Sequence, residues 1–269
     1  MRRALILPLP LLMILCSFGQ DLHYIDSLRN ILNRGGSDTA RTDALYQISH
    51  EFINVNADSC IHYARQGLSL AKKINYKKGQ NFCMDYLAVG LVIKGNYTNS
   101  LPLFFEALQE AEKYGYADRM GSLLNNIGDT YAELGDYNRA IVYAKRNLIL
   151  SQREHDLELE VLACLNLGEY FINLGQVDSA LIYENKAYER NRVFKSSSMD
   201  QDILYNLGRI QAKFNNGDIA LPYYRRSVLL LPQTSDLVYA SKAMYGIGEL
   251  FEEKAHVDSA LYFYKHAAS

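Results

Sequence analysis

Histidine and cysteine are the side chains of this chain best suited to catalysis or metal binding, and their spacing predicts neither. His50-Glu51 begins the helical pattern of a zinc protease, but Asn54 stands where that pattern needs its second histidine. The sequence has no phosphate-binding loop, no nucleophile elbow and no paired cysteines at zinc spacing. We therefore expect no catalytic residue, no metal ligand and no cofactor.

Three cysteines lie beyond the first 19 residues, at Cys60, Cys83 and Cys164. Cys60 replaces a small packing residue, and Cys164 lies on the apolar face of an expected helix. We interpret all three as buried small hydrophobes. A disulfide between Cys60 and Cys83 is the alternative in an oxidising compartment, and the sequence leaves it open.

Asparagines at 40-residue spacing are the better candidates for binding. Asn126, Asn166 and Asn206 each precede a pair formed by an aliphatic residue and a glycine. A carboxamide offers both a donor and an acceptor, so a ladder of asparagines can hold a peptide backbone without selecting its side chains. The alternative is that each asparagine bonds to a neighbouring helix and only spaces the elements.

The same 40-residue spacing runs through the whole chain and defines the elements that position these residues. The glycines of the pair stand at Gly128, Gly168, Gly208 and Gly248, and an alanine follows twelve residues after each one. Weaker copies extend back to about residue 40. Self-similarity at such a period is typical of a solenoid, in which each unit buries its apolar face against its neighbours.

Each unit contains two stretches with apolar residues at spacings of three and four, which predict two amphipathic helices. The short turn between them, such as 135–138, opens mostly with glycine or asparagine, as at a helix end. We expect a column of short polar residues to cap the second helices: Asp58, Thr98, Asn138, Asp178, Asp218 and Asp258. The prediction is an all-α, right-handed solenoid of about 13 antiparallel helices, with six units in 40–269 and an amino-terminal capping helix and loop in 20–39.

Residues 126–143 resemble a tetratricopeptide repeat, or TPR. Its aliphatic-glycine pair, aromatic residue, second glycine, tyrosine and alanine fall in order at Ile127-Gly128, Tyr131, Gly135, Tyr137 and Ala140. The period exceeds the usual ~34 residues. It is similar to the long-helix variety in kinesin light chains and in the extracytoplasmic TPR region of bacterial signalling proteins. The resemblance implies a concave groove lined by first helices, with a protein or peptide as partner.

That resemblance places charged residues beside the asparagines in the groove. Counting one helical turn onward gives Asp129, Glu169, Arg209 and Glu249, and a further turn gives Lys213. We expect Arg209 and Lys213 to select an acidic group on the peptide. The first two units carry apolar residues instead, among them Phe52 and Val89. These suit either an amphipathic partner helix or packing against the amino-terminal helix.

Residues 1–19 have the three-part pattern of a secretory signal peptide: Arg2 and Arg3, then an apolar run, then small residues before a cut after Gly19. Acylation of Cys16 is the alternative. Without Arg2 and Arg3, 26 of the 28 basic residues remain against 30 acidic ones, and no basic stripe favours nucleic acid. We expect a periplasmic protein, or one anchored to the membrane and facing the periplasm, with membrane attachment only through lipidation or a missing downstream segment.

The expected last helix, from about Asp258 to Ser269, is shorter than its counterparts, which favours a chain that continues into a longer protein. The sequence thus predicts a non-catalytic peptide-binding module, the sensor or scaffold region of a signalling protein of the histidine kinase or helix-turn-helix type. The alternative is a free periplasmic scaffold for envelope assemblies. An enzyme using the groove is the least favoured reading.

Overall fold

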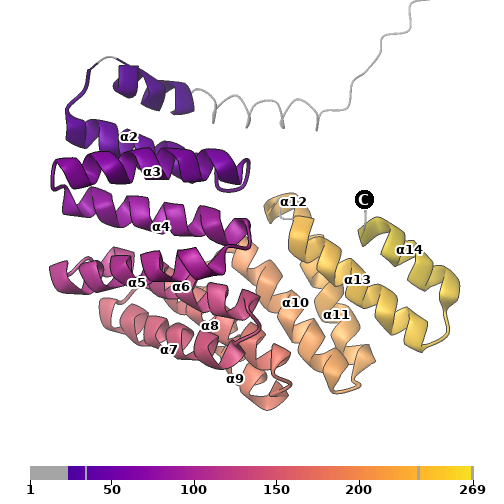
Figure 1. Cartoon of the computed structure of the whole chain (residues 1–269). Helices are drawn as coiled ribbons and strands as arrows, with labels where there is room; N and C mark the ends of the chain where they lie inside the picture. Colours follow the sequence, from indigo (N-terminus) through magenta and orange to yellow (C-terminus); the bar gives the residue numbers. More distant parts are fainter. Residues whose placement is uncertain (1–23, 34, 235–236, 268–269) are drawn as a thin grey trace, which may run out of the picture. The chain divides into compact units, whose positions relative to one another are not determined.

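The computed structural model describes residues 24–33, 35–234 and 237–267, and within these ranges the chain forms helices and turns with no strand. Residues 24–33 are helical and precede the elements labelled in Figure 1. The helices are α2 (Asp38–Glu51), α3 (Ala57–Lys73), α4 (Lys77–Ile93), α5 (Tyr97–Tyr114), α6 (Ala117–Glu133), α7 (Tyr137–Glu154), α8 (Leu157–Asn173), α9 (Val177–Phe194), α10 (Ser197–Lys213), α11 (Gly217–Leu229), α12 (Leu231–Thr234), α13 (Leu237–Glu253) and α14 (Val257–Ala267).

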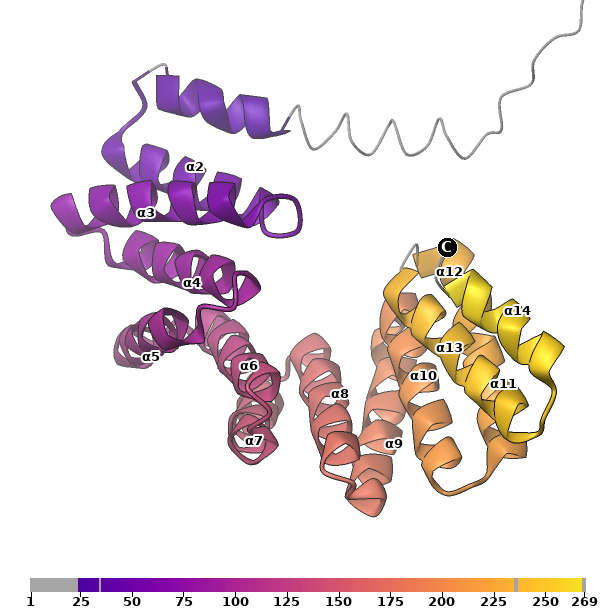
Figure 2. The same cartoon turned by 45° about the vertical axis from the view of Figure 1, so that its right-hand side comes forward.

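The chain divides into two compact units, residues 1–116 and 117–269. In unit 1, α2 pairs with α3 and α4 with α5; in unit 2, the pairs are α6/α7, α8/α9, α10/α11 and α13/α14. Successive pairs of unit 2 pack beside one another, as Figure 2 shows for the last three. This confirms the predicted all-α solenoid of antiparallel helix pairs. The expected signal peptide, 1–19, lies outside the described residues.

Residues with a left-handed backbone conformation (positive φ) follow the ends of helices at the 40-residue spacing of the sequence. Between the two helices of a pair, Gly95, Gly135 and Gly175 have φ of 70°, 73° and 72°, and Asn215 and Ala255 each have φ of 58°. A second series lies in the connections that follow or precede pairs: Gly35, Asn75, Gly115, His155 and Lys195. Positive φ costs glycine little, which explains its frequency at these places. The prediction that glycine or asparagine ends these helices in this conformation is confirmed.

The predicted cap column is wrong by two positions. In α3 the cap is Asn56, whose side chain accepts from the amide of Ser59, and in α7 it is Asp136, which accepts from Arg139. Asp58 is already the second residue of α3. In α7 the helix begins directly after the left-handed Gly135 and the cap Asp136, so the turn is shorter than the sequence suggested. The acidic residues of the column still favour the helix amino terminus electrostatically.

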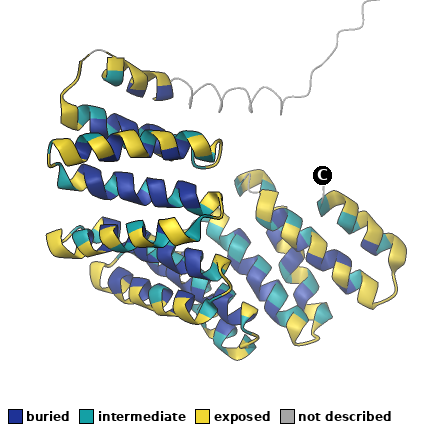
Figure 3. Ribbon diagram, viewed as in Figure 1, coloured by how far each residue is buried: buried dark blue, intermediate teal, exposed yellow. Residues whose placement is uncertain are grey.

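Three of the repeated glycines, Gly168, Gly208 and Gly248, each receive a side chain from the second helix of their own pair. A Cβ at Gly208 would lie 2.6 Å from the ring of Tyr224, and one at Gly248 would lie 2.5 Å from that of Tyr264. The alanine row is equally buried: Ala140, Ala180 and Ala220 have no exposed surface. Buried residues accordingly follow the helix faces turned toward neighbouring helices (Figure 3).

Two further expectations concern unit 1. Cys60 and Cys83 are buried free thiols, as is Cys164, so the disulfide does not form in this structure. Leu28 of the amino-terminal helix joins a buried cluster with Ala44 and Ile48, and Phe52 packs against it. Phe52 therefore packs against the cluster that includes this helix, and it does not form an exposed docking surface.

Candidate functional site

The first helices of unit 2, α6, α8, α10 and α13, contact one another in succession. We call the surface that they share the inner face. The three predicted asparagines lie on these helices in unequal surroundings: Asn126 and Asn166 are half-buried, and Asn206 is 2% exposed. The 40-residue spacing places them at equivalent positions, but it does not decide which of them reaches the surface.

Asn166 belongs to a hydrogen-bonded cluster around Asp129. Tyr170 donates its hydroxyl to Asp129 Oδ1 at 2.5 Å, and Asn125 donates to Oδ2 at 2.8 Å. Asn166 Nδ2 lies 2.7 Å from Asn125 Oδ1 and 3.3 Å from Asp129 Oδ1. The amide of Asn166 therefore orients the Asp129 carboxylate. The hypothesis of a peptide-binding asparagine ladder did not predict this role.

The environment of Asp129 raises its pKa to about 6. Burial is the largest cause, and the negative charges of Glu169 and Glu133 add to it, whereas the bonds from Tyr170 and Asn125 act in the opposite direction. Asp129 is consequently a carboxyl group that changes charge close to neutral pH.

Asp129 lines a pocket of about 420 Å³ that we call the tyrosine pocket. Residues of α6, α8 and α13 and the first residue of α7 surround it. Its lining consists of Asp129, Ala132, Glu133, Tyr137, Asn166, Glu169, Tyr170, Asn173, Tyr239 and Lys242. The pocket thus combines three tyrosines, three carboxylates, two carboxamides and one amine.

A second pocket of about 520 Å³, the arginine pocket, is formed by residues of α10, α11 and α13. It contains the predicted residues Arg209, Lys213 and Glu249. Arg209 connects the two pockets, because it donates to Asn173 at 3.3 Å and its guanidinium lies 3.9 Å from the carboxylate of Glu169. Burial, followed by repulsion from Glu253 and Glu252, raises the pKa of Glu249. Asp129, Asn166 and Glu169 in the tyrosine pocket complete a set of six predicted residues that line the two pockets.

Asn206 does not reach this surface. Its amide donates to Glu184 Oε1 at 2.8 Å, and Glu184 has no exposed surface. The prediction that Asn206 contacts a groove ligand therefore does not fit the geometry, because the side chain is used in a contact between α9 and α10. Asn206 fits the alternative interpretation, in which the asparagine bonds to a neighbouring helix.

In unit 1 the asparagine column is continued by tyrosines, which the sequence analysis did not single out. Tyr46 and Tyr86 stand 40 residues apart at the position of Asn126. Tyr46 stacks on Phe82 with ring centroids 4.5 Å apart, and His50 lies edge-on to Tyr86 at 5.4 Å. Extending the 40-residue register backward from Asn126 would have found these aromatic residues.

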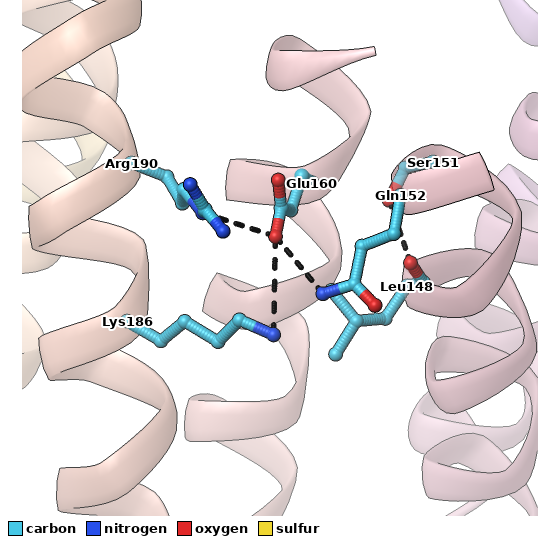
Figure 4. Close-up of polar contacts among 6 residues, drawn as sticks. All are labelled: Leu148, Ser151, Gln152, Glu160, Lys186 and Arg190. Carbon is cyan, nitrogen blue, oxygen red and sulfur yellow. Dashed lines mark hydrogen bonds and ion pairs between the residues drawn. The ribbon is translucent and has the colours of Figure 1, made fainter. Parts of the chain in front are cut away.

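A separate polar cluster joins three helices near the amino terminus of α8 (Figure 4). Glu160 Oε1 accepts from Gln152 of α7 at 3.0 Å and from Arg190 of α9 at 3.1 Å, with the amine of Lys186 at 3.8 Å. Since the side chain of Glu160 is only 7% exposed, this contact is best explained as a link that holds α7 and α9 to α8.

Comparison with known families identifies the kind of repeat. Residues 19–138 match the model of the SusR N-terminal TPR domain, and residues 121–156 match a tetratricopeptide repeat model. These matches agree with the helix pairs, the 40-residue glycine spacing and the inner face. The chain is a tetratricopeptide repeat protein. No curated protein matches the sequence significantly.

Several solved structures share this fold at low sequence identity. A Rap protein complexed with competence and sporulation factor aligns with a TM-score of 0.74 at 18% identity, covering 95% of this chain and 71% of that one. Aspartyl phosphate phosphatase F from Bacillus subtilis gives 0.75 at 15%, covering 93% and 67%. NprR in complex with its cognate peptide NprX gives 0.68 at 15%, covering 93% and 72%. At these identities the likeness concerns the fold.

Proposed function

We propose that this chain is a non-catalytic module that binds a peptide on the inner face of unit 2. The observation that carries the proposal is the pair of pockets joined by Arg209, which contain six residues predicted from the sequence and extend over four successive helix pairs. An extended peptide lying across several pairs would sum modest contacts from each, as other repeat proteins do.

The solved structures support the proposal only in part. The Rap protein with competence and sporulation factor, NprR with NprX and the Rap conjugation regulator with the Phr* peptide are complexes of the same fold. Their ligands belong to those proteins. For this chain the two pockets support the proposal: Asn166 would contact the peptide backbone, and Arg209 and Lys213 would attract an acidic group, whereas Asn126 lines neither pocket.

The pKa of Asp129 is also suited to a general base, and one structural relative is a phosphatase. Turnover of phosphorylated peptides that disappears in Asp129→Asn but not in Glu158→Gln, an exposed change on α8, would favour an enzyme over a binding module.

We further propose that the module works outside the cytoplasm, as the sensor or scaffold region of a bacterial signalling protein. The leader-like pattern of residues 1–19 supports this. Among the described residues, no helix is long and apolar enough to span a membrane. Alkaline phosphatase fused after residue 269 should be active in a bacterial host, and it should become inactive when residues 1–19 are deleted.

Peptide binding is tested by selecting random twelve-residue peptides on the chain and measuring the affinity of the enriched peptides by fluorescence anisotropy. Asn166→Ala with Arg209→Ala should weaken binding by about tenfold or more, because each removes a bond worth roughly 1 kcal/mol. The matched control is Asn185→Ala with Arg192→Ala, two exposed residues of α9. Absence of enriched peptides, or equal binding by both double variants with unchanged thermal melts, would overturn the proposal.

A further inference from the structure

We propose that the tyrosine pocket binds a cationic group of the peptide: the guanidinium or ammonium of an arginine or lysine side chain, or an amino terminus. This inference rests on the proposed function and goes further than it, since the sequence analysis predicted selection of an acidic group only. It assigns opposite charge preferences to the two pockets, with the tyrosine pocket taking the cation.

The distribution of charge in unit 2 favours a cation on the inner face. The first helices α6, α8, α10 and α13 carry eleven acidic and four basic residues, a net charge of −7. The second helices α7, α9, α11 and α14 carry six acidic and ten basic residues, a net charge of +4. The excess of negative charge on the first helices favours positively charged ligands near them over ligands near the second helices.

The lining of the pocket matches the chemistry of an organic cation. Asp129, Glu133 and Glu169 supply negative charge, and the rings of Tyr137, Tyr170 and Tyr239 supply aromatic surface. Aromatic faces attract ammonium and guanidinium groups, and more strongly where water is excluded. A carboxylate cluster alone would also suit an inorganic cation, but three tyrosines add an apolar contact that only an organic cation uses.

The protein already holds one of its own amines at this place. The Lys242 ammonium lies 4.7 Å from the centre of the Tyr239 ring and 5.9 Å from that of Tyr205, and Lys242 lines the pocket. The exposed Lys242 therefore shows that this wall accepts an alkylammonium group. A ligand cation that enters the pocket would meet its like charge, so Lys242 weakens binding and tunes selectivity.

Asp129 is positioned to respond to the cation. Its oxygens are oriented by Tyr170, Asn125 and Asn166, so the carboxylate does not need to reorganise when a ligand arrives. A bound cation would lower the pKa of Asp129 from about 6, and binding would release protons near that pH. The charged and titratable groups that face it are Glu133, Tyr137, Glu169, Tyr170, Tyr239 and Lys242.

The experiment uses a library of nine-residue peptides with acetylated and amidated ends, and a second library with free amino ends. Wild type should enrich lysine and arginine in the first library; enrichment only in the second would assign the pocket to amino termini. Replacing the enriched basic residue by norleucine should weaken binding by about tenfold, as expected for a close charge pair at an interface.

Three variants and one control test the location of the site. Glu133→Gln with Glu169→Gln should remove the preference for the basic residue over norleucine, whereas Glu158→Gln with Glu189→Gln, two exposed changes outside the pocket, should keep it. Lys242→Met should increase affinity for the basic peptide several-fold and leave the norleucine peptide unchanged. Titrations of wild type at pH 6 in two buffers of different ionisation enthalpy should show proton release, and Asp129→Asn should abolish it.

The outcomes separate the two proposals. Peptides that bind the inner face without a basic preference, or a basic preference that survives Glu133→Gln with Glu169→Gln, would overturn the cation site and leave peptide binding intact. Weaker binding in Lys242→Met would do the same, because it would show Lys242 attracting an acidic group. Failure to enrich any peptide in either library would overturn peptide binding itself.

Discussion

Glu184 is a carboxyl group at a position that the two following helix pairs fill with an aromatic ring. Tyr224 and Tyr264 occupy the same position 40 and 80 residues later, each against the repeated glycine of its pair. Glu184 lies in the same way against Gly168, and only its Oε1 has a partner, the amide of Asn206; its Oε2 and Asn206 Oδ1 are both buried without one. Burial raises the pKa of Glu184 well above its ordinary value.

This raised pKa predicts stability that falls with rising pH. The folded chain keeps a proton on Glu184 that the unfolded chain releases above about 4.5, so the contribution is complete below that pH and is lost as the pH rises toward the folded pKa. Glu184→Gln is neutral at every pH and should melt higher than wild type at pH 8, by about 2–4 °C for each kcal/mol gained. The difference should shrink at pH 5. If Glu184→Gln and the exposed control Glu158→Gln have the same melting temperature at both pH values, Glu184 is not a buried neutral acid.

Gly168→Ala should destabilise the fold because the new Cβ would overlap the carboxyl group of Glu184. Overpacking of this kind costs about 1–3 kcal/mol. Urea unfolding of a double-mutant cycle with Glu184→Ala measures it: the alanine at 168 should cost much less when the glutamate is absent. Additive effects of the two changes would contradict the contact.

The sequence predicted positions at this scale better than it predicted partners. The asparagine column lies on the first helices as expected, but Asn206 is buried because Glu184 happens to face it. Asp129 was placed on the inner face, yet its bonds to Tyr170 and Asn125 depend on side-chain geometry between α6 and α8. Periodicity specifies a face of a helix and carries no information about which neighbouring group will be within bonding distance.

At the level of the elements, a left-handed residue precedes the second helix of every described pair from α4/α5 onward, and in α7 the cap Asp136 follows Gly135 directly. The turn before α3 contains no such residue, yet Asn56 caps that helix at the equivalent position. The glycines predicted the turn correctly, but the more regular column that begins at Asp58 placed the predicted cap two residues too late. Both columns contain good capping residues, so only the length of the turn could distinguish them.

The turn residues make a matched pair of predictions. Ala255 has φ of 58°, a strained value for alanine, whereas Gly135 has φ of 73° at the equivalent place. Ala255→Gly should stabilise the folded chain by about 0.5–1 kcal/mol. Glycine relieves the strain of the left-handed conformation, and this gain exceeds the cost of its greater flexibility in the unfolded chain. Gly135→Ala should destabilise by about 1 kcal/mol. Urea midpoints that move in the same direction for both variants would show that the backbone conformation is not the cause.

Glu160 links three helices, and its removal should loosen them together. Glu160→Gln keeps the shape and loses the charge that holds Arg190 and Lys186. Bonds to charged groups contribute about 1.5–3 kcal/mol, and the lower end is expected because Lys186 and Arg190 are partly exposed. Hydrogen exchange should speed up at the ends of α7, α8 and α9 that meet there, with Glu158→Gln as control. Protection that changes only in α8 would contradict the link.

For the whole molecule, the 40-residue period was sufficient to predict an all-α solenoid, because every unit repeats the same pattern of apolar residues that must be buried against its neighbours. The function is harder to predict from the period, because ligand-binding residues are those that packing between helices does not require. In unit 2 these residues differ from pair to pair, and they come together only when α13 closes the tyrosine pocket opposite Asp129. The sequence therefore predicted Asp129, Asn166 and Glu169 of this pocket, and missed Tyr137, Tyr170, Tyr239 and Lys242.

Photocrosslinking can show directly whether a peptide lies on the inner face of unit 2. A photoreactive phenylalanine derivative replaces either Asn173, an exposed residue of the tyrosine pocket, or Asn185, an exposed residue of α9. Each protein is illuminated with the enriched peptides and analysed by mass spectrometry. We expect peptide crosslinks at position 173 and background at position 185. Equal crosslinking at both positions, or crosslinking at 185 alone, would show that the peptide does not lie on the inner face.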